Sequence, residues 1–181
     1  MSRIFHSALA GCVAMGLLTA CTMKVHRVEM DPARLAGKSP AKVACPFRQG
    51  VVVDARPSTG RAGGLGKHLF LVEDASSILR ERMSAAGINV DGSGEVVDVR
   101  LLHMYMTQNQ VTKIPVVVLS ATVGQRPAVT LRSQKAAMNW NSTEDEAYRG
   151  YARAFDDALA QLATHLDAGC ANDSRGQRPP A

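Results

Sequence analysis

Aromatic side chains are scarce in this chain of 181 residues, which contains one Trp, three Tyr and four Phe. A hydrophobic core must therefore be filled mainly by Val, Leu, Ile, Ala and Met. Basic residues do not alternate with aromatic ones along any stretch, as they commonly do on surfaces that bind nucleic acid, so we expect no nucleic-acid partner. After residue 20, no apolar run approaches the roughly 20 residues that a membrane-spanning helix needs.

Motifs of catalytic and cofactor sites are also missing. No serine lies in a G-x-S-x-G context, and no two histidines form an H-x-x-x-H pair. The stretch 60–67 is rich in glycine, but five residues separate Gly60 from Gly66 where a phosphate-binding loop has four, and His68 stands where Ser or Thr would hold magnesium. We expect a flexible loop over residues 57–70, no catalytic residue, no cofactor and no metal site.

Two pairs of polar residues are the remaining candidates for chemistry. Asp54 and Arg56 lie two apart at the end of a predicted strand, so their side chains share a face. An ion pair is the simpler interpretation of that spacing than a catalytic carboxylate with a guanidinium partner. His103 and Tyr105 share a strand face in the same way, and we interpret them as sheet packing rather than as an acid–base pair.

The N-terminal segment has the parts of an export signal. Arg3 supplies a positive charge, and residues 8–18 form an uncharged, mostly apolar stretch that is too short to span a bilayer. Small residues follow, in the order Leu18-Thr19-Ala20-Cys21. We predict that residues 1–20 are a signal peptide.

The sequence at residues 18–21 resembles the lipobox of bacterial lipoproteins. This resemblance implies cleavage between Ala20 and Cys21 and attachment of acyl chains to Cys21. Because each buried methylene contributes about 0.8 kcal/mol and one chain anchors only marginally, two or three chains would hold the protein at a membrane. The alternative is an ordinary signal with a chance cysteine. Cys12 is a poorer lipidation candidate because it lacks the preceding leucine and small residues.

The positive net charge of +5 is concentrated near this cysteine. Residues 22–42 contain five basic and two acidic residues, whereas residues 43–170 contain 13 of each and are neutral. We expect residues 21–42 to be the lipidated cysteine and a basic tether, which would be attracted to anionic lipid head groups. A solvated linker, or a short edge strand over residues 25–30, is the alternative for this segment.

Residues 43–170 are long enough for one domain with its own core. Hydrophobic patterns predict strands over 49–56, 88–90, 95–107, 114–123 and 128–140. They predict helices after Asp74 and Thr143, the second with a capping box formed with Glu146 and an end near Gly169. The order β-α-β-β-β-β-α indicates an α+β fold, a mostly antiparallel sheet with two helices on one face and the other face partly open. We expect residues 171–181 to be a disordered tail.

Two further patterns concern individual positions. The apolar phase of the third strand switches at Leu101-Leu102, which predicts a bulge or a sheet covered on both faces. Cys45 and Cys170 flank the predicted domain, and an oxidising compartment would favour a disulfide between them. Two free thiols, or pairing with another protein, are the alternatives.

The lipobox, the basic segment, the strand ending at residues 51–57 and the helix running into residues 79–90 together resemble the YajG-type family of small bacterial lipoproteins. The strand order is also similar to that of auxiliary lipoproteins of envelope transporters and lipopolysaccharide-assembly lipoproteins. These resemblances imply a non-enzymatic protein at the outer membrane, facing the periplasm, because Thr22 is not the aspartate that retains many lipoproteins in the inner membrane.

We therefore expect a membrane-anchored subunit that binds an envelope protein partner, its open sheet face being the candidate surface. A binder of lipid or another small amphiphile is the alternative. A periplasmic enzyme is the third reading, and no motif favours it.

Overall fold

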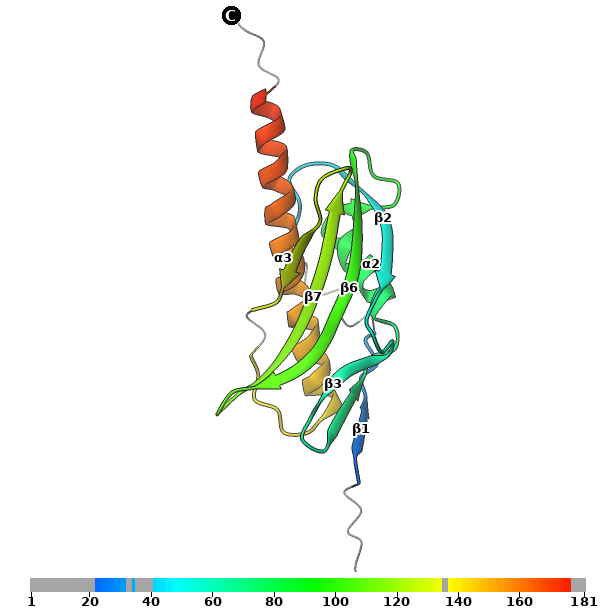
Figure 1. The fold of residues 1–181 in the computed structure, drawn as a ribbon, viewed down its shortest axis with the longest axis vertical. Coiled ribbons are helices and arrows are strands. Elements are labelled where there is room, and N and C mark those ends of the chain that lie inside the picture. The colour runs from blue at the N-terminus through cyan, green and yellow to red at the C-terminus, as the bar shows by residue number, and fades with distance from the viewer. Residues whose placement is uncertain (1–21, 32–33, 35–40, 135–136, 177–181) are drawn as a thin grey trace, which may run out of the picture.

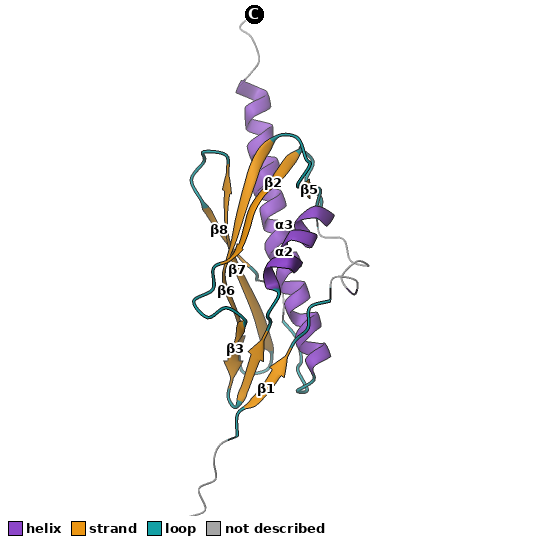
Figure 2. Ribbon diagram, turned by 90° about the vertical axis from the view of Figure 1, so that its right-hand side faces the viewer, coloured by secondary structure: helices purple, strands orange, loops and turns teal. Residues whose placement is uncertain are grey.

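The computed structural model describes residues 22–31, 34, 41–134 and 137–176, with side chains up to Cys170. The predicted signal peptide and Cys21 lie outside the described residues. The predicted α+β class is confirmed, since mostly antiparallel strands form two sheets and two helices pack against the larger sheet (Figure 2).

The larger sheet has five strands, and its longest ladder is the antiparallel pair of β6 and β7 (Figure 1). In spatial order the strands are β5 (Ile88–Asn89), β2 (Phe47–Asp54), β6 (Glu95–Gln108), β7 (Lys113–Val123) and β8 (Val129–Arg132). The β2 strand runs parallel to β5 and β6, and β7 is antiparallel to both of its neighbours. The nearly continuous apolar sequence of β7 fits its position inside the sheet.

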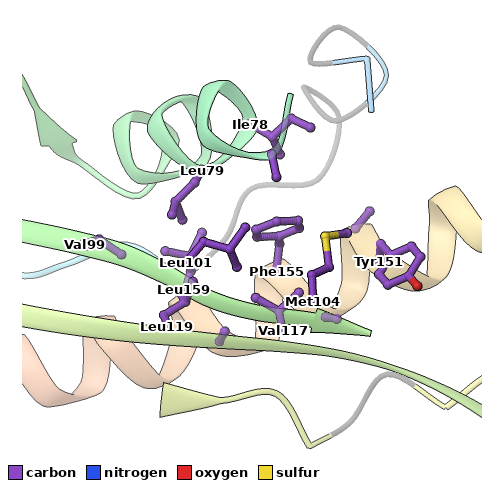
Figure 3. Packing of buried hydrophobic residues seen from close by; sticks show 14 of the residues in the cluster. Ile78, Leu79, Val99, Leu101, Met104, Val117, Leu119, Tyr151, Phe155 and Leu159 are labelled. Carbon is purple, nitrogen blue, oxygen red and sulfur yellow. The ribbon is translucent and has the colours of Figure 1, made fainter. Parts of the chain in front are cut away.

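Helices α2 (Ala75–Ala85) and α3 (Glu144–Gly176) both cover the same face of this sheet (Figure 2). The core lies between the two helices and the sheet, and Figure 3 shows apolar side chains of both helices meeting those of β6 and β7. Leu79 of α2 and Phe155 of α3 are fully buried there, together with Leu101 of β6 and Leu119 of β7. This arrangement leaves the other face of the sheet without a covering helix among the described residues.

The predicted helix ends are partly confirmed. The main-chain N–H of Glu146 donates to Thr143 Oγ1 at 3.2 Å, and the Thr143 N–H donates to Glu146 Oε2 at 3.4 Å, which is the predicted capping box. Gly87 follows α2 with φ of 94°, as a C′ glycine does. The prediction that Gly169 ends the last helix is wrong, because α3 continues to Gly176 and includes the first residues of the predicted disordered tail.

A second, three-stranded sheet contains two strands in the segment predicted as a loop and one strand in the segment predicted as a tether, where an edge strand was the alternative. Its order is β1 (Lys24–Arg27), β4 (His68–Leu71) and β3 (Arg61–Leu65). The predicted flexible loop over 57–70 is therefore wrong: β3 and β4 form a hairpin there. A hydrogen bond connects this hairpin to α3: the buried Tyr151 hydroxyl donates to the Ala62 carbonyl at 2.6 Å.

The predicted tether also needs correction. Residues 24–27 pair in parallel with β4, and Val28 and Met30 are buried in the core. The alternative interpretation, an edge strand, is the one that the structure has. The side chains at alternating positions, His26, Val28 and Met30, point into the protein, while Val25 stays exposed. Burial of the valine and methionine side chains favours this docking over a solvated tether.

The bulge predicted at Leu101-Leu102 is present. The register between β6 and β7 shifts between Leu101 and His103, so one residue of β6 has no partner. Val97, Val99 and Leu101 face the core before the shift, and Met104 and Met106 face it afterwards. The predicted strand over 128–140 is shorter, with β8 ending at Arg132 and a single bridge joining Met138 to Lys113.

Candidate interaction surface

The uncovered side of the larger sheet is the candidate interaction surface, which we call the open face. Successive residues of a strand point to opposite faces of the sheet. The open face consists of the residues of β2, β6, β7 and β8 that point away from the core. Its accessible members are Val51, Val53, Asp98, Arg100, Leu102, His103, Tyr105, Thr130 and Arg132.

A hydrogen bond on the open face joins two strands that are not neighbours, β8 and β6. Arg132 of β8 donates from Nη2 to the Tyr105 hydroxyl of β6 at 3.2 Å, and β7 lies between these two strands. Val116 and Val118 of β7 are buried although they point away from the helices. The apolar parts of Arg132 and Tyr105 thus lie over these valines, while their polar groups remain at the surface.

The β6 bulge determines which groups reach this surface. Without the extra residue, the alternation that directs Val97, Val99 and Leu101 inward would place Met104 and Met106 outward. The bulge restores their burial and directs His103 and Tyr105 to the open face. The sequence prediction that His103 and Tyr105 share a strand face is therefore correct, and they pair opposite Val118 and Val116.

The charge of the open face is unbalanced. Arg100 and Arg132 are both exposed, and Arg48 extends the basic character along β2. The opposing carboxylate is Asp98, whose Oδ1 accepts the Val51 N–H at 2.7 Å and so supports a register shift in β2. Three arginines face one carboxylate, so the open face carries an excess of positive charge.

A recess of about 260 Å³ lies beside β6, at the point where β2 ends and β3 becomes the neighbouring strand. The lining residues include the buried Arg56 and Met104 and the more accessible Ser58, Arg61, His103 and Tyr105. Gly63 permits this junction: its φ is 78°, and a Cβ there would lie 2.8 Å from Tyr105 Cβ. We call this feature the seam recess.

Asp54 and Arg56 form the ion pair that their spacing predicts. Arg56 Nε and Nη2 donate to the two Asp54 oxygens at 2.8 and 2.5 Å. The same guanidinium donates to the Arg61 and Val72 carbonyls at 2.8 and 2.9 Å. Burial alone would raise the pKa of Asp54, but hydrogen bonds from Arg56 and its charge hold that pKa below the usual value. With its donors engaged, Arg56 is placed for structure rather than for acid–base chemistry.

A second polar cluster lies where β1 meets β4. His26 is 1% exposed, and its Nε2 is 2.9 Å from His68 Nδ1. Its ring stacks on Phe70 and meets the edge of Trp140. Burial, then Lys24 and His68, lower the pKa of His26, while Glu144 acts in the opposite direction. Sequence reasoning did not bring these residues together, because their proximity depends on the unpredicted pairing of β1 with β4.

The predicted cysteine pair is joined in the structure. Cys45 and Cys170 form a disulfide with Cα atoms 6.6 Å apart, bridging the segment before β2 to the distal part of α3. Beside it, the Ala44 N–H donates to Asp167 Oδ1 at 2.8 Å. Ala20 and Cys21, the predicted cleavage and lipidation residues, lie outside the described part of the chain.

Metal sites and membrane-spanning helices are both absent from the described residues. No group of three or more His, Cys, Asp or Glu side chains among them is arranged to hold a metal ion. Within the same residues, no helix has the length and apolar character needed to cross a membrane.

Comparisons with protein-family models, with curated proteins and with solved structures give no match for this chain.

Proposed function

We propose that this protein is an envelope lipoprotein, anchored through Cys21, that acts as a non-enzymatic binding or assembly subunit. The proposed location is the periplasmic face of the outer membrane. The observation that supports the binding role most directly is the open face: four strands present an uncovered surface while both helices pack on the opposite side.

The composition of the open face supports a protein partner. Interfaces are enriched in Tyr and Arg and depleted of Lys, Glu and Asp relative to other surfaces. Tyr105, Arg100 and Arg132 follow that preference, and Val51 and Val53 add exposed apolar area beside them. The Tyr105–Arg132 hydrogen bond holds two of these side chains in place before binding, which reduces the entropy lost on association.

A small-amphiphile binder is the second candidate, and the seam recess is the observation that bears on it. Ligand pockets usually enclose about 300–1,000 Å³ and are lined mostly by apolar groups. The seam recess is smaller, at about 260 Å³, and although most of its lining surface is apolar, two arginines, a histidine and a serine contribute to it. The open face therefore supports the assembly role better than the storage of an acyl chain.

Site-specific crosslinking tests this proposal. A photo-crosslinking amino acid at Arg100, on the open face, is expected to capture a defined protein partner in intact envelopes. The same amino acid at Arg153, an exposed arginine on α3, serves as the matched control and should capture nothing. Because the face is basic, adding Arg132→Glu should weaken the capture of this partner from the Arg100 position.

Two results would contradict the assembly role. One is equal capture from the Arg100 and Arg153 positions, since the open face would then have no special part. The other is recovery of monomer alone with copurifying lipid, which would favour the small-amphiphile binder.

A further inference from the structure

One end of the molecule brings together three segments that are far apart in the sequence. The register of β1 on β4 places Lys24 beside His68, at the turn between β3 and β4. Gly63 of β3 lies against Tyr105 and Met106, so β3 runs along β6 toward the β6–β7 turn. The start of β1, the β3–β4 turn and the β6–β7 turn therefore lie at the same end, the lower one in Figures 1 and 2.

The chemistry of this end differs from that of the neutral domain behind it. Met23 is 63% exposed, and Val111 in the β6–β7 turn is 80% exposed. Lysines accompany these apolar side chains in all three segments. We define the anchor end by Met23, Lys24, Leu65, Lys67, Val111 and Lys113.

Acidic side chains near the anchor end lie in the first turn of α3, outside the three segments that form this end. The first turn of α3 contains three: Glu144 lies 3.9 Å from His26, Asp145 pairs with Arg149, and Glu146 caps the helix. Within the anchor end itself, Lys24 and Lys67 are exposed and Lys113 is half-buried. Exposed apolar groups flanked by lysine are suited to the interface of a bilayer, where apolar atoms enter the acyl boundary and ammonium groups meet phosphates.

The position of Cys21 makes the anchor end the natural point of membrane contact. Two residues separate Cys21 from Lys24, and Lys24 is already fixed, since its N–H donates to the Lys67 carbonyl at 2.8 Å. Three residue steps span at most about 10 Å. Acyl chains on Cys21 would therefore hold Lys24 and Lys67 at the level of the lipid head groups.

We propose that the anchor end lies on the bilayer and binds anionic phospholipid head groups, so that the domain stands on the membrane rather than at the end of a tether. This inference rests on the proposed acylation of Cys21. It fixes the orientation of the protein: β6 rises away from the surface over roughly 45 Å at 3.3 Å per residue. The open face then runs up the side of the molecule, where a membrane protein or a periplasmic partner can reach it.

Val90 supplies a matched control position. It is 66% exposed and follows β5, which pairs with the start of β2 at the opposite end of the sheet. Single variants Val111→Cys and Val90→Cys would each carry an environment-sensitive fluorophore. In the mature lipoprotein Cys21 would be acylated and Cys45 and Cys170 are bonded, so the introduced thiol alone reacts.

The labelled lipoproteins would be reconstituted in vesicles of phosphatidylethanolamine and phosphatidylglycerol that contain a nitroxide-labelled phospholipid. The fluorophore at residue 111 is expected to be quenched and blue-shifted, and the one at residue 90 to remain as it is in detergent. Replacing phosphatidylglycerol by phosphatidylcholine, or introducing Lys67→Glu, should reduce the quenching at residue 111.

Intact mass of each sample separates the two possible failures. If the protein carries acyl chains but residues 111 and 90 are quenched equally, or residue 111 is not quenched, the anchor end does not lie on the bilayer and only this inference fails. If Cys21 carries no acyl chain, the proposed anchor fails and this inference fails with it.

Discussion

At the scale of single residues, Gly150 of α3 shows how packing can require a residue that weakens a helix. Alanine would stabilise an exposed helix by about 1 kcal/mol relative to glycine. A Cβ at residue 150, however, would lie 2.7 Å from Pro115 Cγ and would overlap Met138 Sδ. The close neighbours are thus side chains of β7 and of the segment after β8.

We expect Gly150→Ala to lower the free energy of unfolding by about 1–3 kcal/mol, as overpacking commonly does. Urea denaturation of the variant measures this loss. Adding Met138→Ala should recover part of it, because the flexible side chain would no longer occupy the space. A Gly150→Ala protein as stable as the original would show that the two side chains move away without cost.

The Asp54–Arg56 pair gives a prediction with a pH dependence. Asp54→Asn leaves the buried Arg56 charge without its carboxylate, which typically costs about 3–5 kcal/mol. The folded-state pKa of Asp54 is lowered, so its contribution is present above the unfolded pKa of about 3.9 and is lost as pH falls through the folded value.

Urea denaturation at a series of pH values tests this prediction. The stability difference between the original protein and Asp54→Asn should be largest near neutral pH and should shrink once the pH falls below about 4. A difference that is constant over this range would mean that the carboxylate charge does not contribute, and the pair would then act through shape and hydrogen bonds alone.

Sequence reasoning reached some residue-scale features and missed others for a definable reason. The bulge at Leu101 and the Asp54–Arg56 pair are local, since they follow from alternation within one strand. The Tyr105–Arg132 bond depends on how β7 and β8 are aligned, and no local pattern specifies that alignment.

At the scale of elements, β1 is stabilised by a histidine whose burial makes it sensitive to pH. The pKa of His26 is lowered by burial, Lys24 and His68, with Glu144 opposing them. The folded state therefore favours the neutral ring, and its contribution to stability is lost as pH falls below the unfolded value of about 6.5.

We expect the Val28 amide, which donates to the Leu71 carbonyl at 2.8 Å, to lose hydrogen-exchange protection between about pH 7 and pH 5. His26→Phe keeps a ring against Phe70 and removes the titrating group, so its protection should change much less with pH. The same pH response in both proteins would assign the effect to another group.

The disulfide connects the segment before β2 to the distal part of α3. Its two cysteines are 125 residues apart, so the loop it closes is long. For a loop of this length, the chain-entropy model gives about 4–5 kcal/mol of stabilisation. The double variant Cys45→Ser with Cys170→Ser should lose stability of that order in urea denaturation. A decrease in the free energy of unfolding well below about 1 kcal/mol would contradict this prediction. The other contacts of α3 would then hold the helix in place without the disulfide.

The β3–β4 hairpin shows the limit of prediction at the element scale. Its sequence contains three glycines in six residues, a composition that favours a loop. The β3 segment forms a strand because it pairs with β4 on one side and lies against β6 on the other, and because Gly63 allows the close approach to Tyr105. The helices and central strands were predictable from the sequence because their apolar periodicity is strong and local.

At the scale of the whole molecule, the two sheets divide the roles that we propose. The small sheet fixes the N-terminal residues beside the β3–β4 turn and orients the anchor end. The larger sheet buries one face under the helices and presents the other, with its arginines and tyrosine, to a partner. The protein would then act by holding a binding surface upright at a membrane.

Acylation of Cys21 is the central claim, and the intact mass of the protein extracted from envelopes tests it most directly. We predict a chain that begins at Cys21 and carries acyl chains, in the original protein and in the control variant Cys12→Ser. Cys21→Ser should lack the acyl mass and lose its firm attachment to the membrane. A Cys21→Ser protein that keeps the acyl mass and stays in the membrane fraction, or an original protein without acyl chains, would contradict the account.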